Sequence, residues 1–380
     1  MQNSKIYLDH NATSKLLPEV ASIMNELAIR SLANPSSPHW AGREARNLLE
    51  DSRDNLAHYL GVKPREIFFT SGGSESNNSV IRQSLMTSEK KHLISSSIEH
   101  PSILETCQIV ANQQNIEFTE LSVDSSGRIS TEELLAAIRP ETFLISVMSA
   151  NNETGNIQPI EELSKISYEK NILFHTDLVQ SFCKINFDLS KINVDYASAS
   201  AHKIGGPCGI GLLYVKDKSP FHSLISGGKQ ERVRRAGTEN VILAVGFSKA
   251  VEWFSSNQSG LRKKFIQFRK KIFETISKHD EVFINTNLEN SLPHTLNFGI
   301  RGISAESLLI SLDIDGIAIS TGSACSSGSL EASPVLLAMG ISHSDAKSSL
   351  RISFGWSTTK KEIDYFCERL THHIFRIKKK

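Results

Sequence analysis

Short apolar segments recur through the first two thirds of the chain. They are rich in β-branched and aromatic residues, several are apolar at nearly every position, and they occupy residues 66–71, 92–98, 143–150, 172–177, 196–202 and 209–215. Continuous apolar runs of this length are typical of strands that are buried on both faces. The pattern therefore predicts a sheet that is covered on both sides.

Segments with helical periodicity lie between many of these runs. Residues 42–61 carry one apolar stripe and end at Gly61, a residue that commonly stops a helix. Residues 131–139, which follow Ser130, and residues 160–170 have the same character. Alternation of strands and helices predicts an α/β domain with a mainly parallel sheet.

The pattern changes near residue 256. A basic amphipathic helix is expected at 261–279, and short strands are expected at 294–300 and 316–322, with helices between and after them. These elements predict a smaller α+β domain, completed by the N-terminal segment. The expected division is a large α/β domain at 15–255 and a small α+β domain at 1–14 plus 256–380.

Bulk composition limits the classes of function. The 380 residues are 39% hydrophobic and 22% charged, which suits a globular protein large enough for two domains. A formal net charge of +1 gives no reason to expect nucleic acid or an anionic membrane as the main partner. The chain has no run of 18 apolar residues, and its N-terminus resembles neither a signal nor a transit peptide. A cytoplasmic protein is expected, unless a presequence has been removed.

The cysteines argue against a structural metal or a disulfide framework. There are five of them, scattered and without a CxxC pair, at positions 107, 183, 208, 325 and 367. An odd number leaves at least one thiol free of intramolecular pairing. No metal site is expected, and a reducing compartment leaves room for a catalytic cysteine.

The segment 69–76 (FTSGGSES) is a candidate phosphate-binding turn. A strand leads into Gly72, Gly73 and Ser74, and a helix is expected to follow. The free N–H groups at the start of a helix favour an anion, and Ser74 is a candidate helix cap and phosphate donor. A plain strand–helix turn is the alternative interpretation.

Two further candidates follow apolar strands. Lys203 comes directly after the run at 196–202 and precedes two glycines, a setting that favours an amine able to bond covalently to a carbonyl cofactor. Asp177 ends another run, where ligands of open α/β sheets collect. Such an acid can hold the pyridine nitrogen of a cofactor protonated. A surface lysine and a structural carboxylate remain the alternatives.

A candidate thiol and a candidate guanidinium lie in the last third of the chain. Cys325 belongs to STGSACSSGS at 320–329, whose small residues suit an accessible, reactive cysteine. Arg351 opens the apolar run SLRISFG at 349–355, where it can bind a carboxylate in a bidentate manner. A structural salt bridge is the alternative for Arg351.

Taken together and in order, these motifs resemble the cysteine desulfurases, a family of pyridoxal 5′-phosphate enzymes of fold type I. The resemblance extends from LDHNAT at 8–13 and NPSSPHWAG at 34–42 to SLRISFG, and the GSAC sequence around Cys325 indicates the NifS- and IscS-like group. It implies a large, mostly parallel seven-stranded α/β/α domain and a smaller α+β domain that carries Cys325.

The resemblance also implies roles for individual residues. Lys203 would bind the cofactor covalently, His100 would stack on its ring and take part in proton transfer, and Cys325 would receive the sulfur. Asp177 would pair with the pyridine nitrogen and Gln180 with the ring oxygen. The cofactor phosphate would be bound by Gly73, Ser74, Ser200, His202 and Thr238, and the substrate carboxylate by Asn152 and Arg351.

The implied reaction removes sulfur from L-cysteine, releases L-alanine and leaves a persulfide on Cys325. Thr238 would come from the partner subunit, which implies a homodimer. The sulfur acceptor would be an iron–sulfur scaffold or a carrier for tRNA thiolation, with no direct contact to nucleic acid or membrane. Selenocysteine lyase, aminotransferase and non-enzymatic assembly factor remain alternative functions.

The sequence departs from the usual family pattern at several positions. Leu178 replaces an alanine beside the aspartate, where its larger side chain could crowd the cofactor. Cys183 occupies a position where glycine is frequent, Cys208 replaces a commonly basic residue, and Lys229 interrupts a glycine run.

Overall fold

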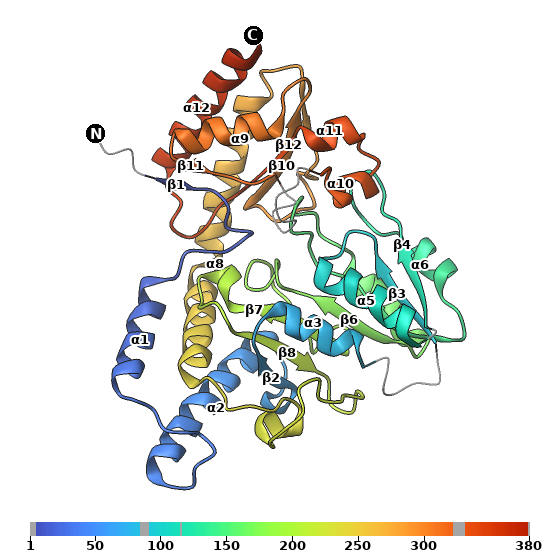
Figure 1. The fold of residues 1–380 in the computed structure, drawn as a ribbon, viewed down its shortest axis with the longest axis vertical. Helices are drawn as coiled ribbons and strands as arrows, with labels where there is room; N and C mark the ends of the chain where they lie inside the picture. Colours follow the sequence, from blue (N-terminus) through green and yellow to red (C-terminus); the bar gives the residue numbers. More distant parts are fainter. Residues whose placement is uncertain (1–4, 84–90, 115, 322–330, 379–380) are drawn as a thin grey trace.

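Seven strands form the central sheet of the protein (Figure 1). The computed structural model describes residues 5–83, 91–114, 116–321 and 331–378. Strand β8 is antiparallel to both of its neighbours, whereas the other pairs are parallel. In spatial order the strands are β2 (Ile67–Thr70), β8 (Gly211–Val215), β7 (Tyr196–Ser200), β6 (Leu173–Asp177), β5 (Thr142–Ser146), β3 (His92–Ser96) and β4 (Glu117–Leu121).

Helices cover both faces of this sheet (Figure 1). Apolar side chains of α3 (Gly73–Ile81) and α5 (Pro101–Gln114) pack with Phe68 on one face. Phe69, the next residue of β2, faces the opposite side and belongs to the core cluster that also contains residues of α2 (Trp40–Leu60) and α7 (Ile160–Glu169). Successive side chains of a strand point to opposite faces, so strands covered on both sides must be apolar throughout. The layered α/β architecture predicted for this region is confirmed.

The local signals in the sequence act as expected, with one exception. Helix α2 ends at Gly61, whose φ of 73° is left-handed and therefore favours glycine. Ser130 caps α6 (Thr131–Ala137) by accepting from the amide of Glu133. The prediction that Ser74 caps its helix is wrong, because α3 already begins at Gly73 and its N-cap, Gly72, has no side chain to offer.

A second group of elements follows the long helix α8 (Val241–Ile276). Its antiparallel sheet has the order β12 (Ser349–Ser353), β10 (Thr295–Ile300) and β9 (Val282–Ile284). The N-terminal strand β1 (Ile6–Tyr7) pairs with β11 (Ile317–Ala318). The remaining helices are α1 (Pro18–Ile29), α9 (Ala305–Ile314), α10 (Pro334–Ala338), α11 (His343–Lys347) and α12 (Lys360–Lys378).

Helix α8 joins the two groups of elements (Figure 1). Its 36 residues run without interruption through residue 255, where the sequence predicted a domain boundary. The division at that residue therefore stays a prediction. Within the described residues, none of the helices is both long and apolar enough to cross a membrane.

A buried glutamate fixes the connection between β3 and α5. Glu99 is 3% exposed, and its Oε1 accepts hydrogen bonds from Ser96 Oγ and from the amide of Met148, which follows β5. Its Oε2 is buried without a partner among the described residues. Burial raises the pKa of Glu99 from 4.5 to about 8. The folded chain therefore holds a neutral carboxyl group here at physiological pH.

The free energy of unfolding should reflect this proton. Because the folded pKa exceeds the unfolded pKa, the stabilisation is complete below pH 4.5 and is lost as the pH rises to about 8. The slope is at most about 1.4 kcal/mol per pH unit. Glu99→Gln mimics the neutral acid, so its stability relative to the wild type should increase between pH 6 and pH 8.5 in urea unfolding. A difference that does not change with pH would contradict the buried proton.

Candidate functional site

A cavity of about 360 Å³ opens at the carboxyl ends of β6 and β7, beside the first turn of α3. Crevices at this edge of a parallel sheet are the usual place for ligands. Nine residues that the sequence singled out line it together: Gly73, Ser74, His100, Asn152, Asp177, Gln180, Ser200, His202 and Lys203.

Lys203 lies in a short 3-10 turn (Ala201–Ile204) that follows β7. Its Nζ donates to the main-chain oxygens of Asn11 and Ala12, at 2.6 and 2.8 Å. Gly205 ends this turn with a φ of 72°, and a Cβ there would lie 2.8 Å from Leu17 Cγ. The close approach of the N-terminal segment thus holds the lysine at the edge of the cavity.

Asp177 ends β6 and is 6% exposed. Its Oδ2 accepts from Asn77 Nδ2 and its Oδ1 from the amide of Val179, both at 2.7 Å. Burial raises the pKa of Asp177, whereas these two hydrogen bonds and the nearby His100 and Lys203 lower it. A buried carboxylate in this position is suited to a cationic ligand, because a positive charge would offset its desolvation.

His100 precedes α5 and lines the same cavity. Its Nδ1 is 2.8 Å from Ser102 Oγ and accepts from the amide of Ser102 at 3.1 Å. Burial lowers the pKa of His100. The ring is therefore neutral at physiological pH.

One end of the cavity is suited to a phosphate. The first turn of α3 contributes Gly73 and Ser74, and its N-cap leaves the first amides without a side-chain partner. A Cβ on Gly73 would lie 2.6 Å from Val179 Cγ2, so glycine permits the helix to approach the cavity. His202 contacts Thr13 Oγ1 through Nδ1 at 2.6 Å, and burial lowers the pKa of His202 to about 4.

The residues predicted to bind a substrate carboxylate lie side by side, but only one lines the cavity. Arg351 Nη1 donates to the main-chain oxygen of Asn152 at 3.1 Å, and Nη2 donates to Asp9 Oδ1 at 2.7 Å. Arg351 is 2% exposed, and its Nε is buried without a partner among the described residues. The structural salt bridge that was the alternative interpretation of Arg351 is thus present in this chain.

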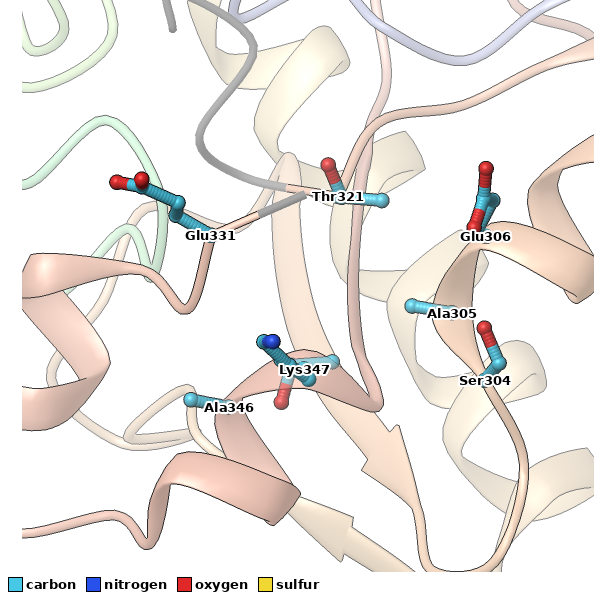
Figure 2. Close-up of a pocket in the computed structure, with 8 residues that line it drawn as sticks. Ser304, Ala305, Glu306, Thr321, Glu331, Ala346 and Lys347 are labelled. Carbon is cyan, nitrogen blue, oxygen red and sulfur yellow. The ribbon is translucent and has the colours of Figure 1, made fainter. Parts of the chain in front are cut away.

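One predicted site residue lies outside the cavity, and another is not among the described residues. Thr238 is exposed and lines a separate depression with Arg235 and Gly209, away from the cavity. Cys325 lies outside the described residues, and the flanking Thr321 and Glu331 line a different pocket of about 210 Å³ with Lys347 (Figure 2).

Sequence reasoning missed several residues of the cavity. Asn77 and Ser102 contact the predicted acid and the predicted histidine, and the main chain of Asn11 contacts the predicted lysine. The LDHNAT motif at 8–13 was noted as a whole, but no role was given to any of its residues.

Leu178 does not line the cavity. It is completely buried in the core, and the lining residues on either side of it are Asp177 and Val179.

Comparison with known proteins places the chain in a family. The aminotransferase class-V family model matches residues 6–366. A cysteine desulfurase IscS from Dictyoglomus turgidum is 40% identical over 377 residues, covering 98% of this chain and 95% of the relative. Putative cysteine desulfurase IscS 1 from Bacillus subtilis is also 40% identical, and the match covers 98% of this chain and 99% of the relative.

Solved structures give the same result. A NifS-like protein superposes with a TM-score of 0.91 at 36% identity, covering 98% of this chain and 99% of that protein. A structure of SspA in complex with cysteine superposes with a TM-score of 0.82 at 38% identity, and the match covers 92% of this chain and 99% of SspA. The fold is thus that of the fold-type I aminotransferases, as predicted. The chain belongs to the aminotransferase class-V family and, within it, to the cysteine desulfurases.

Proposed function

We propose that this protein removes sulfur from L-cysteine with the help of pyridoxal 5′-phosphate and passes the sulfur to Cys325. The observation that carries the proposal is the convergence of Lys203, Asp177 and His100 on one cavity in a chain 40% identical to cysteine desulfurases. The structure of the relative SspA holds cysteine, which supports the choice of substrate.

The residues around the cavity fit pyridoxal phosphate. The cavity volume of about 360 Å³ suits a small cofactor. The first turn of α3, together with Ser200 and His202, would hold the phosphate of that cofactor. Asp177 would pair with the ring nitrogen. The buried Oε1 of Gln180 lacks a partner among the described residues, so a polar ligand beside it would complete its hydrogen bonding.

The bound cofactor supplies an electron sink that stabilises negative charge at the substrate Cα. Lys203 would hold the cofactor covalently at rest and would accept the Cα proton once the substrate amine has displaced it. His100 would stay neutral beside the ring.

Asn152 and Arg351 would bind the substrate carboxylate. Arg351 keeps one donor, Nε, without a partner among the described residues, and its charge is buried. Exchange of the Asp9 contact for the substrate carboxylate would preserve the ion pair.

Sulfur transfer would use the thiolate of Cys325 as the nucleophile. Its Sγ would attack the substrate sulfur, a new S–S bond would form, and the C–S bond would break with its electron pair left on the substrate carbon. Protonation of that carbon and return of the proton from Lys203 to Cα would give alanine, and the transferred sulfur would remain as a persulfide on Cys325.

We further propose a cytoplasmic homodimer that serves a sulfur acceptor protein. Exposure of Thr238 outside the cavity agrees with a role across a subunit interface, as the family resemblance implies. The acceptor would be an iron–sulfur scaffold or a carrier for tRNA thiolation.

The first test is incubation of the full-length protein with pyridoxal phosphate and L-cysteine, followed by mass analysis of the Cys325 peptide. We expect release of alanine and a mass increase of one sulfur atom on that peptide. Cys325→Ala should abolish both, whereas the exposed Cys208→Ala should leave both unchanged. Absence of alanine and of the mass increase in the wild type would overturn the proposal, and amino transfer to a 2-oxo acid would favour an aminotransferase.

The second test concerns retention of the cofactor. Lys203→Ala cannot bond covalently to it, so the visible absorbance that survives dialysis should disappear and alanine formation should fall at least 10²-fold. Lys184→Ala, which changes a lysine that does not line the cavity, should retain the absorbance. Equal retention by wild type and Lys203→Ala would show that another group holds the cofactor.

The third test concerns the substrate carboxylate. Arg351→Lys keeps the positive charge but loses the planar fork, so KM for L-cysteine should rise about 10-fold with a smaller change in kcat. Arg269→Lys is the matched control, because Arg269 contacts main-chain oxygens outside the cavity. Steady-state rates of alanine release give KM and kcat for each variant. An unchanged KM in Arg351→Lys would leave this arginine with a structural role only.

A further inference from the structure

The side-chain amide of Asn77 connects the predicted acid Asp177 to Ser102, which contacts the predicted histidine His100. Asn77, on α3, is 1% exposed. Its Nδ2 donates to Asp177 Oδ2 at 2.7 Å and to Ser102 Oγ at 3.0 Å. These two bonds use both hydrogens of the amide. The other Asp177 oxygen is held by the amide of Val179, so the carboxylate is fixed from two directions.

The same link determines which nitrogen of His100 carries hydrogen. Ser102 Oγ receives a hydrogen from Asn77, so its own hydrogen is available to Nδ1 of His100, 2.8 Å away. The main-chain amide of Ser102 also donates to this Nδ1, at 3.1 Å. A main-chain N–H cannot accept, so Nδ1 must present a lone pair. The hydrogen of the neutral ring is then on Nε2.

We propose that Asn77 is a positioning residue that, together with Ser102, holds His100 as the neutral Nε2–H tautomer while it orients the Asp177 carboxylate. His100 consequently offers a hydrogen-bond donor to the cavity. The lone pair of Nδ1 is taken up by Ser102 and Nε2 carries hydrogen, so the ring has no free lone pair for a proton that leaves the substrate, and Lys203 is left as the acceptor. The roles proposed for Asn77 and Ser102 add to the proposed function, and they rest on that function only for the identity of the substrate.

Charge and burial agree with this arrangement. Protonation of the ring would place an N–H of Nδ1 against the N–H of Ser102, and burial independently lowers the pKa of His100. Rotation of the Asn77 amide by 180° would set its oxygen against the carboxylate of Asp177, so the orientation with Nδ2 toward Asp177 is the favourable one.

The test uses the full-length protein with histidine rings labelled with ¹⁵N, studied by NMR with and without pyridoxal phosphate. His100→Gln identifies the two signals of His100 by their loss. In the wild type near pH 7 we expect a protonated Nε2 and an unprotonated Nδ1. A protonated Nδ1 with a lone pair on Nε2 would overturn the proposal.

Two variants test the path through Ser102. Ser102→Ala removes one donor to Nδ1, and Asn77→Leu removes the bond that orients that donor, so each should raise the proton affinity of His100 about fivefold, the effect of one hydrogen bond. The double variant should show little more than either single change, because the two residues act in series. Additive effects, or unchanged His100 signals in Asn77→Leu, would show that Asn77 has no such role.

A control separates this effect from general loss of stability. Ser79 lies on the same helix and is 3% exposed, and its Oγ donates to Glu75 O within α3. Ser79→Ala removes this buried hydrogen bond without changing Asn77, Ser102 or Asp177, so it should leave the His100 signals as in the wild type. The tautomer is measured without substrate, so an inactive enzyme with the expected tautomer would count against the proposed function alone.

Discussion

The buried carboxylate of Asp177 is the group on which the rest of the site depends. Removing an ionised carboxylate from water is unfavourable unless donors or a cation replace the lost solvation. Here the donors are the amide of Val179 and the side chain of Asn77. Both come from segments at the carboxyl edge of the sheet, α3 after β2 and the turn after β6, and the strand order brings these two segments together at the acid.

The N-terminal segment connects this edge to the second sheet. The main-chain oxygen of Asn11 accepts from Lys203 Nζ and from Gln180 Nε2, at 2.6 and 3.1 Å. Its side chain donates to the oxygen of Asn152 and to Thr295 Oγ1 in β10. Asn11 is 1% exposed, and through these bonds it sets the distance between the predicted cofactor lysine and the residues predicted to bind substrate.

The sequence predicted well those features that a local pattern encodes. Runs of apolar residues indicated the buried strands, and Gly61 indicated the end of α2. Strand β4 (Glu117–Leu121) was missed because it lies at the edge of the sheet and is only partly buried, so it has no apolar run. Lys203 and Asp177 were found because both follow buried strands whose ends meet at one edge.

Contacts between segments that lie far apart in the sequence could not be predicted from such local patterns. Asp9 and Arg351 are 342 positions apart, and no local signal pairs them. Asn77 and Ser102 lie in helices, where polar residues usually indicate a solvated face, and only the packing of α3 against α5 brings them together. This packing gives His100 its environment, so the properties of the histidine follow from helix contacts and not from the motif that contains it.

The departures from the family pattern affect packing and not the cavity. Leu178 adds to the core below Asp177. Cys183 is buried with a φ of 61°, a conformation that is unfavourable for a residue with a side chain. Cys208 and Lys229 are exposed, and neither lines the cavity. None of these four residues lines the cavity, so the substitutions leave the arrangement of Lys203, Asp177 and His100 intact.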